Sequence, residues 1–275
     1  MLALPTHATI QPMSKRSSKQ SRKKQRRSNQ TAASSGQRVA LAAILPLVGA
    51  LALSALVGGV LSPDSEGSAA PFFAGLGTIA WFIGLRWYGI KGMGLRGGRP
   101  LFAGIGFATL AWIALLIFRF IFPTISAIGV GTAVAGRAFI FLLLFEAFAL
   151  QIWTFGTLFR AISDWRGPLT AAVGSGLVFG TIGSIFFQEV FVTNWSSLLY
   201  FGIWGILYGI IRLRTGSLLG MVILQALQSF TTWTVLLPDP IPLVRQLTPM
   251  YVATAVAYAI FIWRLWPKEE EDYRV

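Results

Sequence analysis

The sequence predicts an all-α fold, a polytopic membrane helix bundle of about eight transmembrane helices with both chain ends on the cytoplasmic side. Composition is the first reason, because 55% of the 275 residues are hydrophobic and only 12% are charged, whereas soluble domains carry about one quarter charged residues. The second is a series of apolar windows, each long enough to cross a bilayer. The third is that Lys and Arg gather in alternate connections between those windows.

The chain begins with a basic leader, residues 1–38, for which we expect disorder. It holds nine Lys and Arg residues and no acidic residue. Segments rich in Ser, Gln, Lys and Arg have too little apolar surface to fold alone. A polybasic segment beside a membrane is attracted to anionic lipid, so we expect lipid as its partner. RNA or an acidic protein is the alternative, and nucleic acid is the less expected partner.

About 20 apolar residues cross the roughly 30 Å hydrocarbon core of a bilayer. Windows of this kind form a bundle over residues 39–266, followed by a cytoplasmic tail at 267–275. The sixth window is short by itself. The eight windows lie near residues 39–61, 71–88, 101–122, 138–159, 168–187, 197–211, 217–237 and 248–266.

Charge tests this count independently. If the N-terminus is cytoplasmic, the inner segments contain 20 of the 23 Lys and Arg residues, with Arg212 and Arg214 assigned to one inner connection. Cytoplasmic segments of membrane proteins collect Lys and Arg. An even number of spans with both ends inside therefore follows.

Small residues recur every four positions in the fifth and sixth windows. They are Ala172, Gly176 and Gly180 in the fifth, and Gly205 and Gly209 in the sixth. Stripes of this kind let membrane helices approach closely. We expect the two helices to pack against each other along these residues.

A few polar residues fall at membrane depth, where ionisable groups are costly and are candidates for function. Glu146 in the fourth window and Arg119 near the outer end of the third predict either a structural ion pair or a proton or substrate site. Gln151 and Gln225 each lie about eight residues from a cytoplasmic helix end, so we expect an amide pair at one depth.

Histidine and cysteine are nearly absent. His7 in the leader is the one histidine, and there is no cysteine. Imidazole and thiolate are common metal ligands and catalytic groups near neutral pH. We therefore expect no metal site and no cofactor in the apolar part of the chain.

Three motifs occur in order along one segment. TLFRAI (157–162) contains the pair Phe159 and Arg160, SGLVFG (175–180) contains Phe179, and YGIIRLRTGSLLGMVILQALQSF (208–230) places an RTGSL turn between two helices. On these motifs residues 136–237 resemble the CPBP family, membrane proteins related to CAAX prenyl endopeptidases and bacteriocin-immunity proteases. The sequence also resembles cyanobacterial members, which implies a plasma or thylakoid membrane.

The resemblance implies a glutamate-based intramembrane protease, in which Glu and His activate water while a second His and an Asn polarise the scissile carbonyl. The family's paired glutamates fall on Phe155 and Gly156, its arginine on Arg160, its histidines on Gly183 and Gln225, and its asparagine on Ser229. The residues at 155, 156, 183 and 225 cannot take up a proton near neutral pH. We therefore expect a pseudoprotease, with Arg160 as an interfacial anchor or, as the alternative, a retained partner or headgroup site.

The leading hypothesis is a non-catalytic membrane assembly or regulatory factor that binds a hydrophobic or transmembrane partner in the bundle cleft. The first alternative is an active CPBP intramembrane endopeptidase, which would have to use a shifted carboxylate such as Glu146. The second is a small-solute transporter, for which eight spans and the polar set Glu146, Gln151 and Gln225 are the evidence.

Overall fold

The computed structural model describes residues 15–61, 69–122, 125, 127–129, 131–187, 195–237 and 244–274. Two strands of two residues, β1 (Ala127–Ile128) and β2 (Leu236–Leu237), pair antiparallel. Three π-helical segments, η1 (Leu142–Ala147), η2 (Ile152–Leu158) and η4 (Thr231–Val235), and a 3-10 turn, η5 (Glu270–Asp272), accompany the α-helices. The α-helices are α1 (Lys15–Leu61), α2 (Ala69–Gly92), α3 (Arg99–Ile121), α4 (Thr132–Phe141), α5 (Phe148–Gln151), α6 (Phe159–Arg166), α7 (Pro168–Phe187), α8 (Trp195–Thr215), α9 (Leu219–Phe230) and α10 (Val244–Leu265).

The predicted all-α membrane bundle is confirmed. Within the described residues, 7 helical stretches are long and apolar enough to cross a membrane. They correspond to seven of the eight predicted windows. The remaining window, 217–237, contains the shorter apolar helix α9, which continues into η4. The sixth window, which is short in the sequence, is extended at both ends, to Trp195 and Thr215, into the full 21-residue helix α8.

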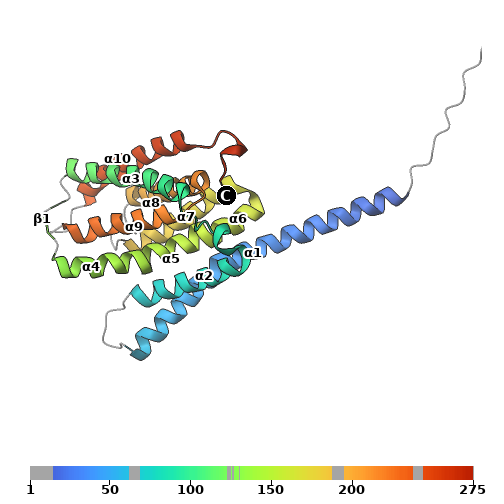
Figure 1. Ribbon diagram of the computed structural model, residues 1–275, viewed down its shortest axis with the longest axis horizontal. Helices are drawn as coiled ribbons and strands as arrows, with labels where there is room; N and C mark the ends of the chain where they lie inside the picture. Colours follow the sequence, from blue (N-terminus) through green and yellow to red (C-terminus); the bar gives the residue numbers. More distant parts are fainter. Residues whose placement is uncertain are drawn as a thin grey trace, which may run out of the picture.

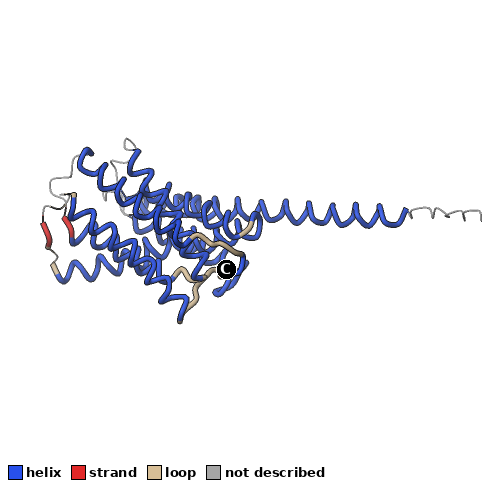
Figure 2. Tube along the Cα trace, turned by 90° about the horizontal axis from the view of Figure 1, so that it is seen from above, coloured by secondary structure: helices blue, strands red, loops and turns tan. Residues whose placement is uncertain are grey.

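The helices run side by side along one axis (Figure 1). The strands β1 and β2 lie at one end, which we call the far end. The residues after α10, 266–274, lie at the other end, which we call the tail end. The first turns of α1 extend beyond the bundle on the tail side (Figure 2), so both ends of the described chain lie on the same side.

Helix α1 begins at Lys15, inside the segment for which we expected disorder. The physical reason is that Lys, Arg and Gln have good helix propensity, and no Gly or Pro interrupts the chain between Lys15 and Gly36. Once the apolar part of α1 is helical, propagation toward the N-terminus adds residues without a new nucleation step. Residues 1–14 of the predicted leader lie outside the described part.

Helices α7 and α8 pack backbone against backbone, as the small residues predict. A Cβ atom added to Gly176 would lie 2.5 Å from the carbonyl oxygen of Gly205, and one added to Gly180 would lie 2.5 Å from that of Phe201. One added to Gly209 would collide with the carbonyl oxygen of Ala172. Contacts this close leave no room for a side chain, so the glycines fix the separation of the two helices.

The fourth window forms one long helical stretch built from α4, η1, α5, η2 and α6. Its spanning part, Ala135–Arg166, has 32 residues. The π segments η1 and η2 break the α-helical register twice. Such segments are rare and occur frequently at functional sites. Here η1 contains Glu146, and η2 contains Phe155 and Gly156, so both breaks lie where the sequence places candidate residues.

The predicted C-terminal tail is docked onto the tail end of the bundle. Asp272 forms an ion pair with Arg214 at the end of α8. The Arg274 amide donates to the Leu213 carbonyl over 2.9 Å, and the Arg96 guanidinium donates to the Arg274 carbonyl over 3.1 Å. Main-chain bonds on both sides of Arg274 hold this segment across the turn between α8 and α9.

Candidate functional site

Phe155, onto which the resemblance places the family's first glutamate, belongs to an aromatic cluster. The ring of Phe155 on η2 lies 5.4 Å from that of Phe179 on α7 and 6.4 Å from that of Tyr208 on α8. Phe179 also contacts Trp204, with ring centroids 5.3 Å apart. All four side chains are buried. Three helices therefore meet through aromatic rings where the resemblance implies reactive groups.

The glycines at the neighbouring positions are also buried. A Cβ on Gly156 would meet Leu218 at 3.5 Å and the Met93 carbonyl oxygen at 3.7 Å, which is ordinary contact. Gly183 lies on α7 one turn beyond Phe179, on the same helix face. Neither position supplies a group that could transfer a proton. Within the described ranges, no cluster of three His, Cys, Asp or Glu residues could hold a metal ion.

Gln151 and Gln225 form the amide pair that their depth predicts. Nε2 of Gln151 donates to Oε1 of Gln225 over 2.7 Å, and both side chains are fully buried. The reverse bond is not made, because Oε1 of Gln151 and Nε2 of Gln225 have no hydrogen-bond partner within the described structure. The pair joins α5 to α9 and leaves one acceptor and one donor open in the core.

Glu146 and Ser229 form a second polar contact, toward the far end. The Ser229 hydroxyl donates to Oε1 of Glu146 over 2.7 Å, and both residues are buried. The partner that the structure gives Glu146 is therefore the hydroxyl group of Ser229, onto which the resemblance places the family's asparagine. A direct ion pair between Glu146 and Arg119 stays a prediction.

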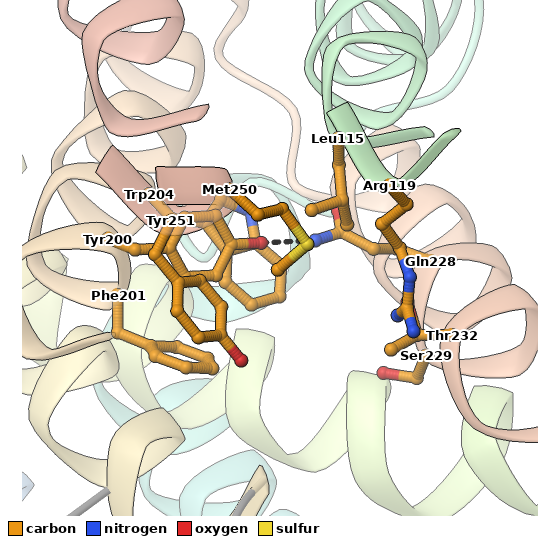
Figure 3. Close-up of a pocket in the computed structure, with 10 residues that line it drawn as sticks. All are labelled: Leu115, Arg119, Tyr200, Phe201, Trp204, Gln228, Ser229, Thr232, Met250 and Tyr251. Atoms are coloured by element: carbon orange, nitrogen blue, oxygen red, sulfur yellow. Dashed lines mark hydrogen bonds between the residues drawn. The ribbon is translucent and has the colours of Figure 1, made fainter. Parts of the chain in front are cut away.

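Arg119 lines a small pocket of about 40 Å³ near the far end (Figure 3). Its wall has a polar side, with Arg119, Gln228, Ser229 and Thr232, and an aromatic side. The aromatic side is formed by Tyr200, Phe201, Trp204 and Tyr251, and Leu115 and Met250 complete the lining. Arg119 is only 6% exposed, and Nε2 of Gln228 donates to the Tyr200 hydroxyl over 3.0 Å.

Arg212 is the residue that the sequence analysis missed. We counted it with an inner connection, but its side chain is fully buried near the end of α8. Nε donates to the Phe155 carbonyl over 3.2 Å, and the guanidinium lies 5.2 Å from the Phe159 ring centroid. The signal was present in the spacing, because Arg212 is one turn beyond Tyr208 and continues the buried face of α8.

Arg160 lies at the surface of α6, where its Nε is 3.5 Å from Oδ1 of Asp164, one turn away. Its side chain is 31% exposed. An exposed i,i+4 pair of this kind contributes a few tenths of a kcal/mol. Its predicted role as an interfacial anchor stays a prediction.

We compared the chain with models of known protein families, with curated proteins and with solved structures. Residues 131–231 match the family model described as type II CAAX prenyl endopeptidase Rce1-like. This segment, which we call the Rce1-like segment, is similar to that family. The comparisons with curated proteins and with solved structures gave no match. The predicted CPBP resemblance is thereby confirmed, with nearly the same boundaries.

The Rce1-like segment covers less than half of the chain, and it contains part of the candidate site. Phe155, Gly156, Gly183, Gln225 and Ser229 all lie within it, together with Glu146, Gln151 and Arg160. The pocket is different, because Arg119 comes from α3 and Tyr251 from α10, on either side of the segment. The pocket is therefore built jointly by the Rce1-like segment and the helices that flank it.

Proposed function

We propose that the protein is a non-catalytic CPBP-type membrane factor that binds a hydrophobic or transmembrane partner and acts in assembly or regulation. One observation carries the proposal. The side chains at positions 155, 156, 183 and 225 have no proton to give or take near neutral pH, and Phe155 is packed among aromatic rings.

Peptide hydrolysis needs a base to activate water and a group to stabilise the oxyanion. In the Rce1-like segment, the paired amides of Gln151 and Gln225 can donate and accept hydrogen bonds but cannot act as a base. The Arg212 guanidinium, which donates to the Phe155 carbonyl, has donors but no acceptor and likewise cannot act as a base. Both features support a binding role over a hydrolytic one.

One contact favours the alternative, an active endopeptidase. Glu146 is a buried carboxylate in the Rce1-like segment and is hydrogen-bonded to Ser229. A buried carboxylate at membrane depth is a candidate for function. It would have to activate water without a histidine, because the chain has none between α1 and α10.

The decisive experiment is a cleavage assay on the purified full chain in proteoliposomes, with a prenylated CAAX-type peptide and a transmembrane peptide as substrates. We expect no cleavage above the protein-free background. Glu146→Gln keeps the acceptor for Ser229 and serves as the matched control, so it should behave as the unchanged protein does. Turnover that is lost in Glu146→Gln would establish the endopeptidase instead.

Affinity purification from native membranes tests the partner. We expect a stable complex with another membrane protein or a bound hydrophobic molecule, and an isolated protein with neither would contradict the proposal.

We further propose that the protein resides in the plasma or thylakoid membrane and that its basic leader binds anionic lipid. Membrane fractionation, and flotation of the leader peptide with and without phosphatidylglycerol, check these two points.

A further inference from the structure

The far-end pocket has the two-sided character of a site for an amphiphile. Figure 3 shows the aromatic rings of Tyr200, Phe201 and Tyr251 on one side and the side chains of Arg119 and Ser229 on the other. A site that is cationic at one wall and apolar at the opposite wall matches a molecule with an anionic group and a hydrocarbon part.

Burial makes the cation at this pocket significant. Arg119 is 6% exposed at the end of a membrane-spanning helix, and a guanidinium removed from water gains most from an anion in direct contact. Guanidinium groups bind carboxylate and phosphate oxygens through two parallel hydrogen bonds. The cavity of about 40 Å³ has room for a group of that size and not for a whole lipid.

Gln228 provides a second, independent indication of a polar ligand. Its Nε2 is engaged by Tyr200, but its Oε1 is buried and has no hydrogen-bond partner among the described residues. Gln228 itself is 3% exposed and lines the pocket. An unsatisfied buried acceptor is destabilising, and a ligand group that donates a hydrogen bond there would satisfy it.

Glu146 reaches the pocket wall through Ser229 but does not line the pocket itself. Glu146 accepts the hydroxyl of Ser229, and the ten residues that line the pocket do not include it. Ser229, which does line the pocket, uses its proton on Glu146. The Ser229 hydroxyl is therefore engaged, and Arg119 is the charged side chain of the pocket wall.

We propose that this pocket binds the anionic headgroup of an amphiphile, with Arg119 contacting the anion and the rings of Tyr200, Phe201 and Tyr251 contacting its apolar part. The inference goes beyond the proposed function and does not depend on it. Binding here is measured directly, whether or not the protein cleaves peptides.

The test uses the full chain in nanodiscs of phosphatidylcholine, with binding followed by native mass spectrometry and by the shift in Tm. The probes are oleate, its methyl ester, and phosphatidylglycerol. We expect oleate, phosphatidylglycerol or both to bind and raise the Tm, while the methyl ester does not. Binding of oleate alone identifies a free carboxylate, binding of phosphatidylglycerol alone identifies a lipid headgroup, and both together identify the shared anion chemistry.

Three variants locate the site. Arg119→Gln should weaken binding at least tenfold, whereas Arg137→Gln, an exposed arginine of α4 at the same end, should leave it unchanged. Thr232→Leu fills the pocket without altering charge, so it should also weaken binding and gives a readout if Arg119→Gln does not fold. The proposal is overturned if neither anionic probe binds, if the methyl ester binds as tightly as oleate, or if Thr232→Leu has no effect.

Discussion

Gln151 and Gln225 are joined by one hydrogen bond in the core of the bundle, with no water-exposed atom on either side chain. Replacing either one by Leu should lower the free energy of unfolding, because the remaining amide loses its partner. The double variant should be less destabilised than the sum of the two single variants, by about 1 kcal/mol, the usual size of such bonds between membrane helices. Steric trapping or unfolding in mixed micelles measures this coupling. Strictly additive effects would mean that the bond contributes nothing.

Two cases show which side-chain contacts could be predicted from the sequence and which could not. The amide pair was predictable, because two positions at the same distance from the same membrane surface face similar surroundings. Arg212 was not predicted, since an arginine near a helix end is ordinarily drawn to the aqueous interface. In this protein Arg212 meets carbonyl groups of two distant segments, Phe155 and Gly92. Only the tertiary fold supplies those partners.

Arg212 also makes a testable contribution of its own. Arg212→Ala removes the hydrogen bond to the Phe155 carbonyl and leaves a cavity beside the Phe159 ring. We expect the free energy of unfolding to fall by about 2–5 kcal/mol, as for other large-to-small changes in packed cores. Arg214→Ala, two residues away and partly exposed, is the matched control and should cost less than 1 kcal/mol. Unfolding measured in detergent distinguishes the two. Equal losses would contradict the buried role of Arg212.

Among the elements, the contact between α7 and α8 gives the sharpest contrast between neighbouring positions. Gly205→Ala would drive a methyl group into the backbone of Gly176, whereas a Cβ on Gly202 of the same helix meets nothing within 4 Å. We expect Gly205→Ala to destabilise the bundle by about 1–3 kcal/mol through overpacking. Gly202→Ala should be neutral or stabilising by up to about 1 kcal/mol, since Ala favours helix.

Thermal unfolding of the two variants in one detergent provides the measurement. If Gly205→Ala were as stable as Gly202→Ala, α7 and α8 could not be packed at the described separation.

The close approach of α7 and α8 was predictable from a four-residue repeat of small residues. The π segments were not, because η1, η2 and η4 add single residues to helices whose apolar character is uniform, so hydropathy carries no trace of the break in register. The fold class, in contrast, could be predicted from the sequence, because it depends on the number and length of the apolar segments and not on the register within each helix.

At the scale of the whole molecule, the docked tail responds to pH through Asp272. The Lys268 amide donates to Oδ2 of Asp272 over 3.0 Å, and with the nearby Arg214 guanidinium it holds the pKa of Asp272 below its ordinary value. The contact therefore stabilises docking above the ordinary Asp pKa of about 3.9. It is lost as the pH falls through the lower pKa of the folded state. Asp272→Asn should weaken the docking of the tail even at neutral pH, although the main-chain bonds of Arg274 remain.

Spin labels measure this directly, because the chain contains no cysteine of its own. We would place single cysteines at Gly97, where a side chain meets nothing within 4 Å, and at the exposed Glu270. The distance distribution between the labels should broaden at low pH and in Asp272→Asn. Glu271→Gln, an exposed neighbour, is the control and should leave the distribution narrow. A distribution that ignores both pH and Asp272→Asn would show that this contact does not hold the tail.

The shared construction of the far-end pocket has an evolutionary consequence. Its polar wall comes largely from α9 and η4, while the cation comes from α3 and part of the aromatic wall from α10. Helices that lie outside the Rce1-like segment can therefore exchange residues, and so change which molecule is held, without disturbing the packing inside that segment. A chain of this design can acquire new ligands at its borders while its centre keeps an inherited architecture.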